Sequence, residues 1–424
     1  MPGTDVNRTI ETVWRIESAR LIAGLARVVR DVGLAEDLAQ EALVAALEQW
    51  PRSGVPDNPG AWLMATGKHR AIDRLRRAAV QERKTQELGH EIELRGELER
   101  PDLEAAIDDP FDDDLLRLIF TTCHPVLSTD ARVALTLRLL GGLTTPEIAR
   151  AYLVAEATVA QRIVRAKRTL AAARVPFEVP ERGELAERLA AVLEVIYLVF
   201  NEGYAATAGE HWMRPELIDE ALRLGRVLAV LLPAEPEVHG LVALMELQAS
   251  RSRARTGPGG EPVLLLDQDR ARWDWLLVGR GLTALDRALA TGGALGPYTL
   301  QATIAACHSR AREASDTDWE RIVALYDGLA QLMPSPVVEL NRAVAVGMAF
   351  GPEAALELVE ALESEDALRG YHLLPAVRGD LLARLGRSEE AGVEFERAAA
   401  LTANERERTV LLRRAAGCTP RNGA

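Results

Sequence analysis

The chain has 424 residues, of which 48% are hydrophobic, 27% charged and only 4% aromatic. This length and composition exclude a small disulfide-stapled scaffold and a disordered chain, and the scarcity of aromatic residues argues against an all-β fold. The net charge of −13, taken over the whole chain, argues against nucleic-acid binding, because proteins bind DNA by neutralising its phosphates with Lys and Arg.

The charge is distributed unevenly along the chain. Residues 1–80 carry a net +1 and residues 115–175 a net +6, whereas residues 81–114 carry −9 and residues 176–424 carry −11. The acidity therefore lies in two blocks, and the segment between them is basic enough to face an anionic partner.

Several classes of site have no support in the sequence. The cysteines Cys123, Cys307 and Cys418 are odd in number and far apart, which indicates neither a disulfide framework nor a zinc site. The N-terminus lacks a signal-peptide pattern, and the longest apolar run, 195–200, is far shorter than the roughly 20 residues that span a bilayer. We expect a soluble, cytoplasmic protein without a metal, a cofactor or a membrane partner.

Helical periodicity dominates the first part of the chain. It predicts helices over 8–30, 34–50 and 59–77. The last of these has good start signals, because Asn58 suits the N-cap and Pro59 the first helical position.

The acidic segment 81–111 is predicted to be a linker. Beyond it, the pattern predicts helices over 112–123, 129–140, 145–152 and 156–173. The stretch VPFEVP after Val175 marks a boundary, and the rest of the chain is predicted to be helix after helix. We therefore expect an all-α protein with domains at 1–80, 112–175 and 176–424.

The end of the chain has repeat character. In the window 371–404, Gly379, Ala391, Phe395 and Ala398 have spacings typical of a tetratricopeptide helix pair, in which small residues allow close helix contact. Residues 336–362 resemble a degenerate earlier copy. Any antiparallel helix pair favours the same alternation of small and large residues, so the repeat assignment rests on one good copy.

The segment 141–170 predicts a helix-turn-helix. Thr144 and Glu147 have capping-box spacing, and a turn then leads into a second helix with Val159, Ile163 and Ala166 on one face. The polar residues of that helix project elsewhere, and they are Thr158, Gln161, Arg162, Arg165 and Arg168. Such a helix enters the major groove, whereas the alternative is a helical hairpin with solvated arginines.

The segment 31–77 contains a polar patch and a basic helix. Asp37, Gln40 and Glu41 lie within one turn and suit the arginines of a partner protein. The following helix carries Lys68, Arg70, Arg74, Arg76 and Arg77. Trp62 near its start suits stacking on an unpaired base, although a place in the core is the alternative.

These stretches resemble the extracytoplasmic-function (ECF) sigma factors of the sigma-70 family. AEDLAQEALVAALEQWP resembles regions 2.1 and 2.2, and NPGAWLMATGKHRAIDRLRR resembles regions 2.3 and 2.4. Residues 115–173 resemble regions 4.1 and 4.2, so the resemblance covers residues 10–175. It implies two small helical sigma domains, a region 2 bundle and a region 4 helix-turn-helix, that recruit core RNA polymerase to promoter DNA.

The resemblance also implies a role for each surface. The helix that docks on the β′ clamp helices of RNA polymerase would use Leu34, Asp37, Leu38, Gln40 and Glu41. The −10 element would be held by Trp62, Lys68, His69, Arg70, Arg74, Arg76 and Arg77. The −35 element would be read by Thr145, Thr158, Gln161, Arg162, Arg165, Lys167 and Arg168, in a domain that also contacts the β flap.

The chain departs from the family pattern in three places. His69 stands where an Asn is common, and Ala155 stands where Ser often caps the recognition helix. Ala160-Gln161-Arg162 replaces a usual Lys-Ser-Arg, which removes one cation. These departures put the base preferences at both promoter elements in doubt.

The long C-terminal half resembles the helical extension of one ECF subgroup, usually numbered 42. The segments that carry this resemblance are 197–209, 264–275 and 296–311. It implies that the extension itself controls activity without a dedicated anti-sigma factor, and that a small YCII-related protein is a partner.

Other functions are weaker fits to this half. An acid-base or metal site could be assembled from Glu202, Glu210, His211, Asp267, Asp269 and His308, but no catalytic motif spacing accompanies them. We therefore expect no catalysis, and we expect Asn201, Glu202 and Tyr204 to form a buried hydrogen-bonding cluster. Two alternatives to a sigma factor remain: a helix-turn-helix regulator with a helical sensor domain, and an inactive scaffold built on a sigma-like relic.

Overall fold

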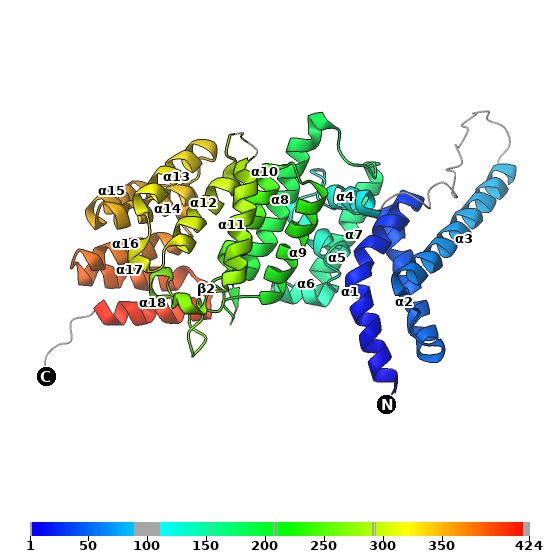
Figure 1. Ribbon diagram of the computed structural model, residues 1–424, viewed down its shortest axis with the longest axis horizontal. Coiled ribbons are helices and arrows are strands. Elements are labelled where there is room, and N and C mark those ends of the chain that lie inside the picture. The colour runs from blue at the N-terminus through cyan, green and yellow to red at the C-terminus, as the bar shows by residue number, and fades with distance from the viewer. Residues whose placement is uncertain are drawn as a thin grey trace. The chain divides into compact units, whose positions relative to one another are not determined.

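The computed structural model describes residues 2–88, 111–152, 154–206, 208–209, 211–290, 292 and 294–418, and these are mostly helical (Figure 1). The chain divides into two compact units, Met1–Ile196 and Tyr197–Ala424. None of the described helices is long and apolar enough to cross a membrane.

The first unit begins with three helices, and the predicted start signals are present. They are α1 (Pro2–Val29), α2 (Val32–Ser53) and α3 (Pro59–Leu88). Asp31 caps α2 by accepting from Leu34 N at 2.8 Å, and Asn58 caps α3 by accepting from Ala61 N at 3.1 Å. α3 continues beyond the predicted end at residue 77, and residues 89–110 of the predicted linker lie outside the described residues.

The predicted helices of the next segment are confirmed to within one residue at each end. They are α4 (Phe111–Thr122), α5 (Thr129–Leu139), α6 (Thr145–Ala151) and α7 (Glu156–Ala172). Buried apolar side chains form the core here, among them Leu118, Phe120 and Leu135. A further helix, α8 (Arg182–Tyr204), follows VPFEVP.

α8 belongs to both units, since the division falls inside it. Its first half contacts the preceding helices: Arg188 Nη2 donates to the Phe120 carbonyl at 3.0 Å, and Arg132 pairs with Glu194 at 3.2 Å. The first unit therefore extends about twenty residues beyond the boundary predicted at residue 175.

The second unit consists of helices that pack against their neighbours in chain order (Figure 1). They are α9 (Pro215–Leu231), α10 (Pro236–Ala249), α11 (Trp275–Ala290), α12 (Pro297–Arg310), α13 (Trp319–Leu332), α14 (Pro336–Ala349), α15 (Pro352–Leu362), α16 (Leu373–Arg384), α17 (Ser388–Leu401) and α18 (Glu405–Cys418). Pro begins many of them, because its missing N–H costs nothing at the first helical position. A short parallel pair, β1 (Ala208–Gly209) with β2 (Ala403–Asn404), joins distant parts of the chain.

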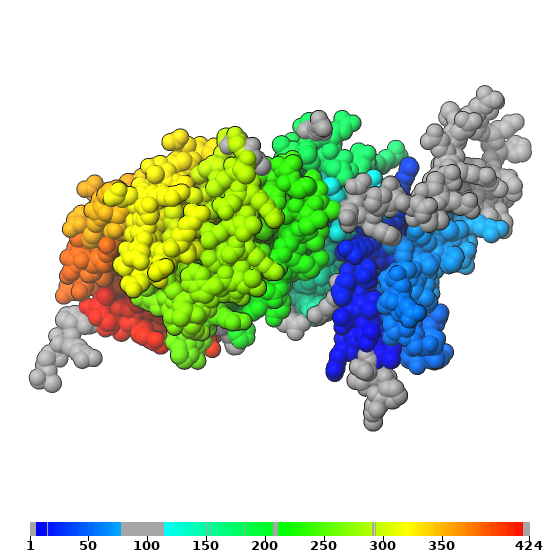
Figure 2. Space-filling view, in the orientation of Figure 1, coloured from blue at the N-terminus to red at the C-terminus, as the bar shows by residue number. Residues whose placement is uncertain are grey.

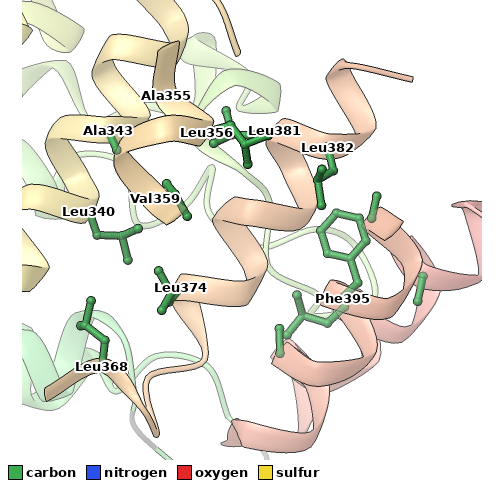
Figure 3. Packing of buried hydrophobic residues seen from close by; sticks show 14 of the residues in the cluster. Leu340, Ala343, Ala355, Leu356, Val359, Leu368, Leu374, Leu381, Leu382 and Phe395 are labelled. Carbon is green, nitrogen blue, oxygen red and sulfur yellow. The ribbon is translucent and has the colours of Figure 1, made fainter. Parts of the chain in front are cut away.

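The repeat-like end of the chain forms the predicted helix pairs. α16 packs on α17, and a Cβ at Gly379 would lie 2.9 Å from Phe395 Cε1. Phe395 is only 1% exposed, and Figure 3 shows its ring beside Leu382 in a cluster that also includes Leu340 and Val359. The small residue thus allows the close contact predicted from the spacing.

Candidate functional site

The predicted docking patch on α2 is a stripe that is exposed only in part. Asp37 is exposed, and Leu34, Gln40 and Glu41 are half-buried. Leu38 is completely buried, so it packs inside the unit and can only support the stripe from below.

Two exposed apolar residues extend this stripe. Val44 and Leu47 are 51% and 44% exposed, and they follow Glu41 at helical spacing on the side opposite the core. The sequence analysis did not include these two residues in the patch. The signal that could have identified them is that both are apolar and lie outside the buried row Leu38–Ala42–Ala45. The stripe therefore combines carboxylates with apolar surface, as interfaces commonly do.

Glu41 links the predicted polymerase-binding and −10 surfaces. Its two carboxylate oxygens accept from Arg70 Nη1 at 3.1 Å and from Arg74 Nη1 at 3.2 Å. Exposed ion pairs contribute about 0–1 kcal/mol, so binding of a partner to either side can replace them.

The predicted −10 residues lie along α3. His69, Arg74, Arg76 and Arg77 are exposed, and Trp62, Lys68 and Arg70 are half-buried. The ring of Trp62 meets the buried Trp50 edge to face, with centroids 5.4 Å apart. Trp62 is thus held by the core along one edge and remains partly accessible, an arrangement that suits base stacking.

The helix-turn-helix has the predicted geometry. Thr144 N donates to Glu147 Oε2 at 2.7 Å, and Glu147 N donates to Thr144 Oγ1 at 3.3 Å, which completes the capping box that begins α6. On α7, the apolar face of Val159, Ile163 and Ala166 is buried. Ala155, at the N-cap of α7, makes no side-chain capping bond.

The outward face of α7 carries most of the predicted −35 residues. Thr158, Gln161, Arg165 and Arg168 are exposed, and Thr145, Arg162 and Lys167 are half-buried. Two of the cations have carboxylate partners, since Arg162 pairs with Asp130 at 2.9 Å and Lys167 pairs with Glu36. The fully exposed residues therefore form the accessible part of this face.

Glu36 is the centre of a buried polar network. It is 4% exposed, and its Oε1 accepts from Gln40 Nε2 at 2.8 Å and from Arg138 Nε at 2.7 Å. Lys167 is its third partner. Gln40 and Lys167, both predicted to contact macromolecules, therefore also contribute to the packing of α2 against α5 and α7.

A second buried carboxylate was also missed from the sequence. Asp114 pairs with Arg27 at 3.0 Å and with Arg117 at 2.8 Å, and its side chain is 3% exposed. In the sequence it is one letter of the acidic run DDPFDDD, which gives no signal that this particular residue faces inward.

The residues considered for chemistry in the second half have structural contacts. Glu202 is buried and pairs with Arg214 at 2.5 Å, and Asp269 caps a short turn by accepting from Ala271 N at 2.9 Å. His308 meets Trp319 edge to face at 5.1 Å, and Glu210 lies outside the described residues. No group of three metal-binding side chains occurs in the described ranges.

Three family models match separate parts of the chain. Residues 16–80 match sigma-70 region 2, residues 117–170 match sigma-70 region 4, and residues 188–289 match a family of unknown function, DUF6596. An uncharacterised protein of Rhizobium meliloti strain 1021 is 48% identical over 391 residues, which cover 91% of this chain and 90% of that protein.

Two mycobacterial proteins match a smaller part of the chain. The ECF RNA polymerase sigma factor SigC of Mycobacterium tuberculosis and the probable RNA polymerase sigma-C factor of Mycobacterium bovis are each 29% identical over 167 residues. The match covers 39% of this chain and 80% of each of those proteins.

Proposed function

Because the chain belongs to the ECF sigma factors of the sigma-70 family and carries a C-terminal helical extension, we propose which of its surfaces perform the binding steps. The protein binds core RNA polymerase and promoter DNA. We assign the stripe on α2 to the β′ clamp helices and the α4–α7 domain to the β flap.

The exposed stripe on α2 supports the first assignment most directly. Asp37, Glu41 and Val44 follow one another along a single face, while the opposite face of α2 is buried. Such a helix face can pack on a partner helix, and its carboxylates can pair with arginines.

Charge reversal in the stripe tests this assignment. Asp37→Arg should weaken binding to purified core RNA polymerase at least about tenfold, because it places a cation where the partner's arginines bind. Asp37 is preferred to Glu41, whose reversal would also break the contacts with Arg70 and Arg74.

Glu11→Arg is the matched control, since Glu11 is exposed on α1 and undergoes the same change of charge. Its core binding should stay within about twofold of the unchanged protein. Equal binding by Asp37→Arg and the control would contradict the assignment. Promoter-DNA binding without core binding would instead favour a helix-turn-helix regulator.

We assign −10 binding to α3 and −35 reading to α7. Exposed arginines supply phosphate contacts, whereas Gln161 and Thr158 are short polar groups suited to base edges. Gln161→Ala should relax the preference at one −35 base pair, and Arg168→Ala should weaken all duplexes alike. Similar, sequence-independent losses for both variants would contradict base reading by Gln161.

We assign control of the sigma factor's activity to the helices from α9 to α18, and we assign no catalysis to them. We assign a YCII-related protein as the partner of these helices. The support is the sequence resemblance of the extension and its net charge of −11, which discourages nonspecific DNA binding. A chain ending at Tyr204 keeps the α8 contacts of Arg188 and Glu194. It should transcribe differently from the full chain, and identical transcription in cells and in vitro would contradict control by the extension.

The partner assignment has its own test. The YCII-related protein should co-purify with the full chain and not with the chain ending at Tyr204. Co-purification with both chains, or with neither, would contradict binding to the extension.

A further inference from the structure

A cluster of cationic side chains lies in the second unit, away from the surfaces assigned above. We call Arg251, Arg255 and Arg270, together with His308, the arginine cluster. The guanidinium of Arg255 lies 3.4 Å from the centroid of the Tyr204 ring and 4.4 Å from that of Trp212. The Arg251 guanidinium lies 5.9 Å from the same Tyr204 ring.

Hydrogen bonds and ring contacts fix the orientation of these guanidinium groups. Arg255 Nη1 donates to the Tyr204 carbonyl at 2.5 Å, and Arg251 Nη2 donates to the Tyr204 hydroxyl at 2.9 Å. Arg270 Nη1 donates to the carbonyls of His308 at 2.5 Å and Ala311 at 2.7 Å. The cluster is therefore pre-organised rather than a set of solvated side chains.

The cluster has no direct ion pair with a carboxylate. None of its three guanidinium groups forms an ion pair with a carboxylate in the described part of the chain. By contrast, Arg378 in the same unit pairs with Glu394 at 2.6 Å and with Glu363 at 3.5 Å. Arg255 is the buried member of the cluster, at 7% exposure, and burying a cation without a carboxylate partner is costly.

Buried polar atoms in the cluster and in the tryptophans beside it also lack partners. Arg270 Nη2 and the Nε1 atoms of Trp212 and Trp273 have no hydrogen-bond partner among the described residues, and neither has His308 Nδ1. Buried polar atoms normally have partners, so unpartnered ones require an explanation. An acceptor supplied by a ligand would satisfy several of them.

The neighbouring charges agree with this electropositive character. Burial lowers the pKa of Arg255 to about 10, and burial with the charges of Arg251 and Arg270 lowers the pKa of His308 to about 4. Glu407 and Asp316 oppose these shifts, since their charges act to raise the pKa of Arg255 and of Arg270. Neither acid contacts a guanidinium of the cluster directly: Glu407 accepts from Thr402 at 2.7 Å and pairs with His372 at 3.0 Å, and Asp316 accepts from Glu313 N at 3.3 Å.

We propose that the arginine cluster binds a small anion through an oxyanion group, either a carboxylate or a phosphate. Guanidinium groups recognise both through paired N–H donors. Arg255 is 7% exposed and His308 is 8% exposed, so a small group can reach them more readily than the face of a folded partner can. Arg251 and Arg270 are half-buried and would make the first contacts.

Binding would link segments that are distant in sequence. The cluster draws on the loop between α10 and α11 and on the end of α12, and it contacts Tyr204 at the end of α8. That loop lies beside the start of α18, where Arg406 Nη1 donates to the Gly259 carbonyl at 2.9 Å (Figure 2). An anion here would stabilise the second unit as a whole.

Thermal unfolding of the full-length protein tests the proposal. Inorganic phosphate and malonate are titrated separately at ionic strength held constant with sodium chloride. At least one should raise the unfolding midpoint of the second unit saturably, by about 3–6 °C at ten times its dissociation constant. The anion that acts identifies the oxyanion class.

Substitutions localise the effect. Arg251→Gln should raise, at least about tenfold, the anion concentration needed for a given increase in the unfolding midpoint, because a charge-assisted contact is lost. The matched control is Arg253→Gln, an exposed arginine two residues away, which should leave the response unchanged. Arg270→Gln provides a second variant if Arg251→Gln is unstable without ligand.

Three outcomes would overturn the proposal. These are a response that follows ionic strength alone, an equal response in Arg251→Gln and Arg253→Gln, and stabilisation by polyglutamate without any by phosphate or malonate. Because the readout is unfolding rather than transcription, the result does not depend on the sigma-factor assignments.

Discussion

Replacing Glu36 by Ala should destabilise the first unit strongly. The substitution leaves Arg138 and Lys167 without their carboxylate, and their side chains are only 24% and 20% exposed. Removing one partner of a buried ion pair costs about 3–5 kcal/mol. Since water can reach part of both cations, we expect a loss of about 2–3 kcal/mol in the free energy of unfolding.

Amide hydrogen exchange in α2, α5 and α7, measured at increasing urea concentrations, gives the free energy of unfolding of the first unit alone. Glu48→Ala is the control, because Glu48 is exposed on the same helix and should change stability by less than about 0.5 kcal/mol. Equal stabilities of Glu36→Ala and Glu48→Ala would refute the ion-pair reasoning.

The same substitution should also affect DNA binding, because it releases Lys167 from Glu36. A released Lys167 can neutralise one more phosphate, so the dependence of log affinity on log salt should steepen by about one for a −35 duplex. An unchanged slope in a folded Glu36→Ala protein would show that Lys167 does not reach DNA.

Three further substitutions test local features. Ala155→Ser should stabilise α7 by about 1 kcal/mol in amide exchange, because the N-cap backbone is already extended and lacks a side-chain acceptor; no gain over Ala157→Ser would contradict this. Gly379→Ala should lower the free energy of unfolding by about 1–3 kcal/mol, because the added methyl group overlaps Phe395. The control Gly279→Ala in α11, where nothing lies within 4 Å of the added group, should be neutral or stabilising. Equal effects of the two substitutions would contradict the close contact between Gly379 and Phe395. His308 has a folded-state pKa of about 4 against an ordinary 6.5, so the stability due to its neutral ring is complete above pH 6.5 and is lost towards pH 4, by up to about 3 kcal/mol. His308→Gln should flatten this pH dependence relative to His69→Gln, and parallel curves would contradict the assignment.

Local signals in the sequence were sufficient to predict most elements of the first unit. The Asn58 cap, the Thr144–Glu147 capping box and the buried face of Val159 and Ile163 all depend on residues within a few positions of one another. Periodicity and capping act over the same short range, which explains why these predictions were confirmed. The Gly379–Phe395 contact was predictable for a related reason, since the two residues lie on helices that follow one another in the chain and have the spacing typical of a tetratricopeptide helix pair.

Contacts between distant segments could not be predicted in this way. Glu36 meets Arg138 across 102 positions, and a glutamate near the start of an amphipathic helix is ordinarily exposed. The arginine cluster likewise combines Arg251, Arg255 and Arg270 with the distant His308, and it contacts Tyr204. The predicted boundary at residue 175 followed a Pro-containing stretch, whereas α8 continues the packing of the first unit to Ile196.

Transcription in vitro with purified core RNA polymerase tests the central claim most directly. The template should carry a promoter identified by crosslinking the full-length protein in cells. The full chain with core enzyme should give a promoter-dependent transcript that core enzyme alone does not give. Asp37→Arg should reduce this transcript strongly at limiting protein concentration, while Glu11→Arg retains it. The absence of any promoter-dependent transcript, with the full chain alone or with a co-purified partner, would contradict an active sigma factor.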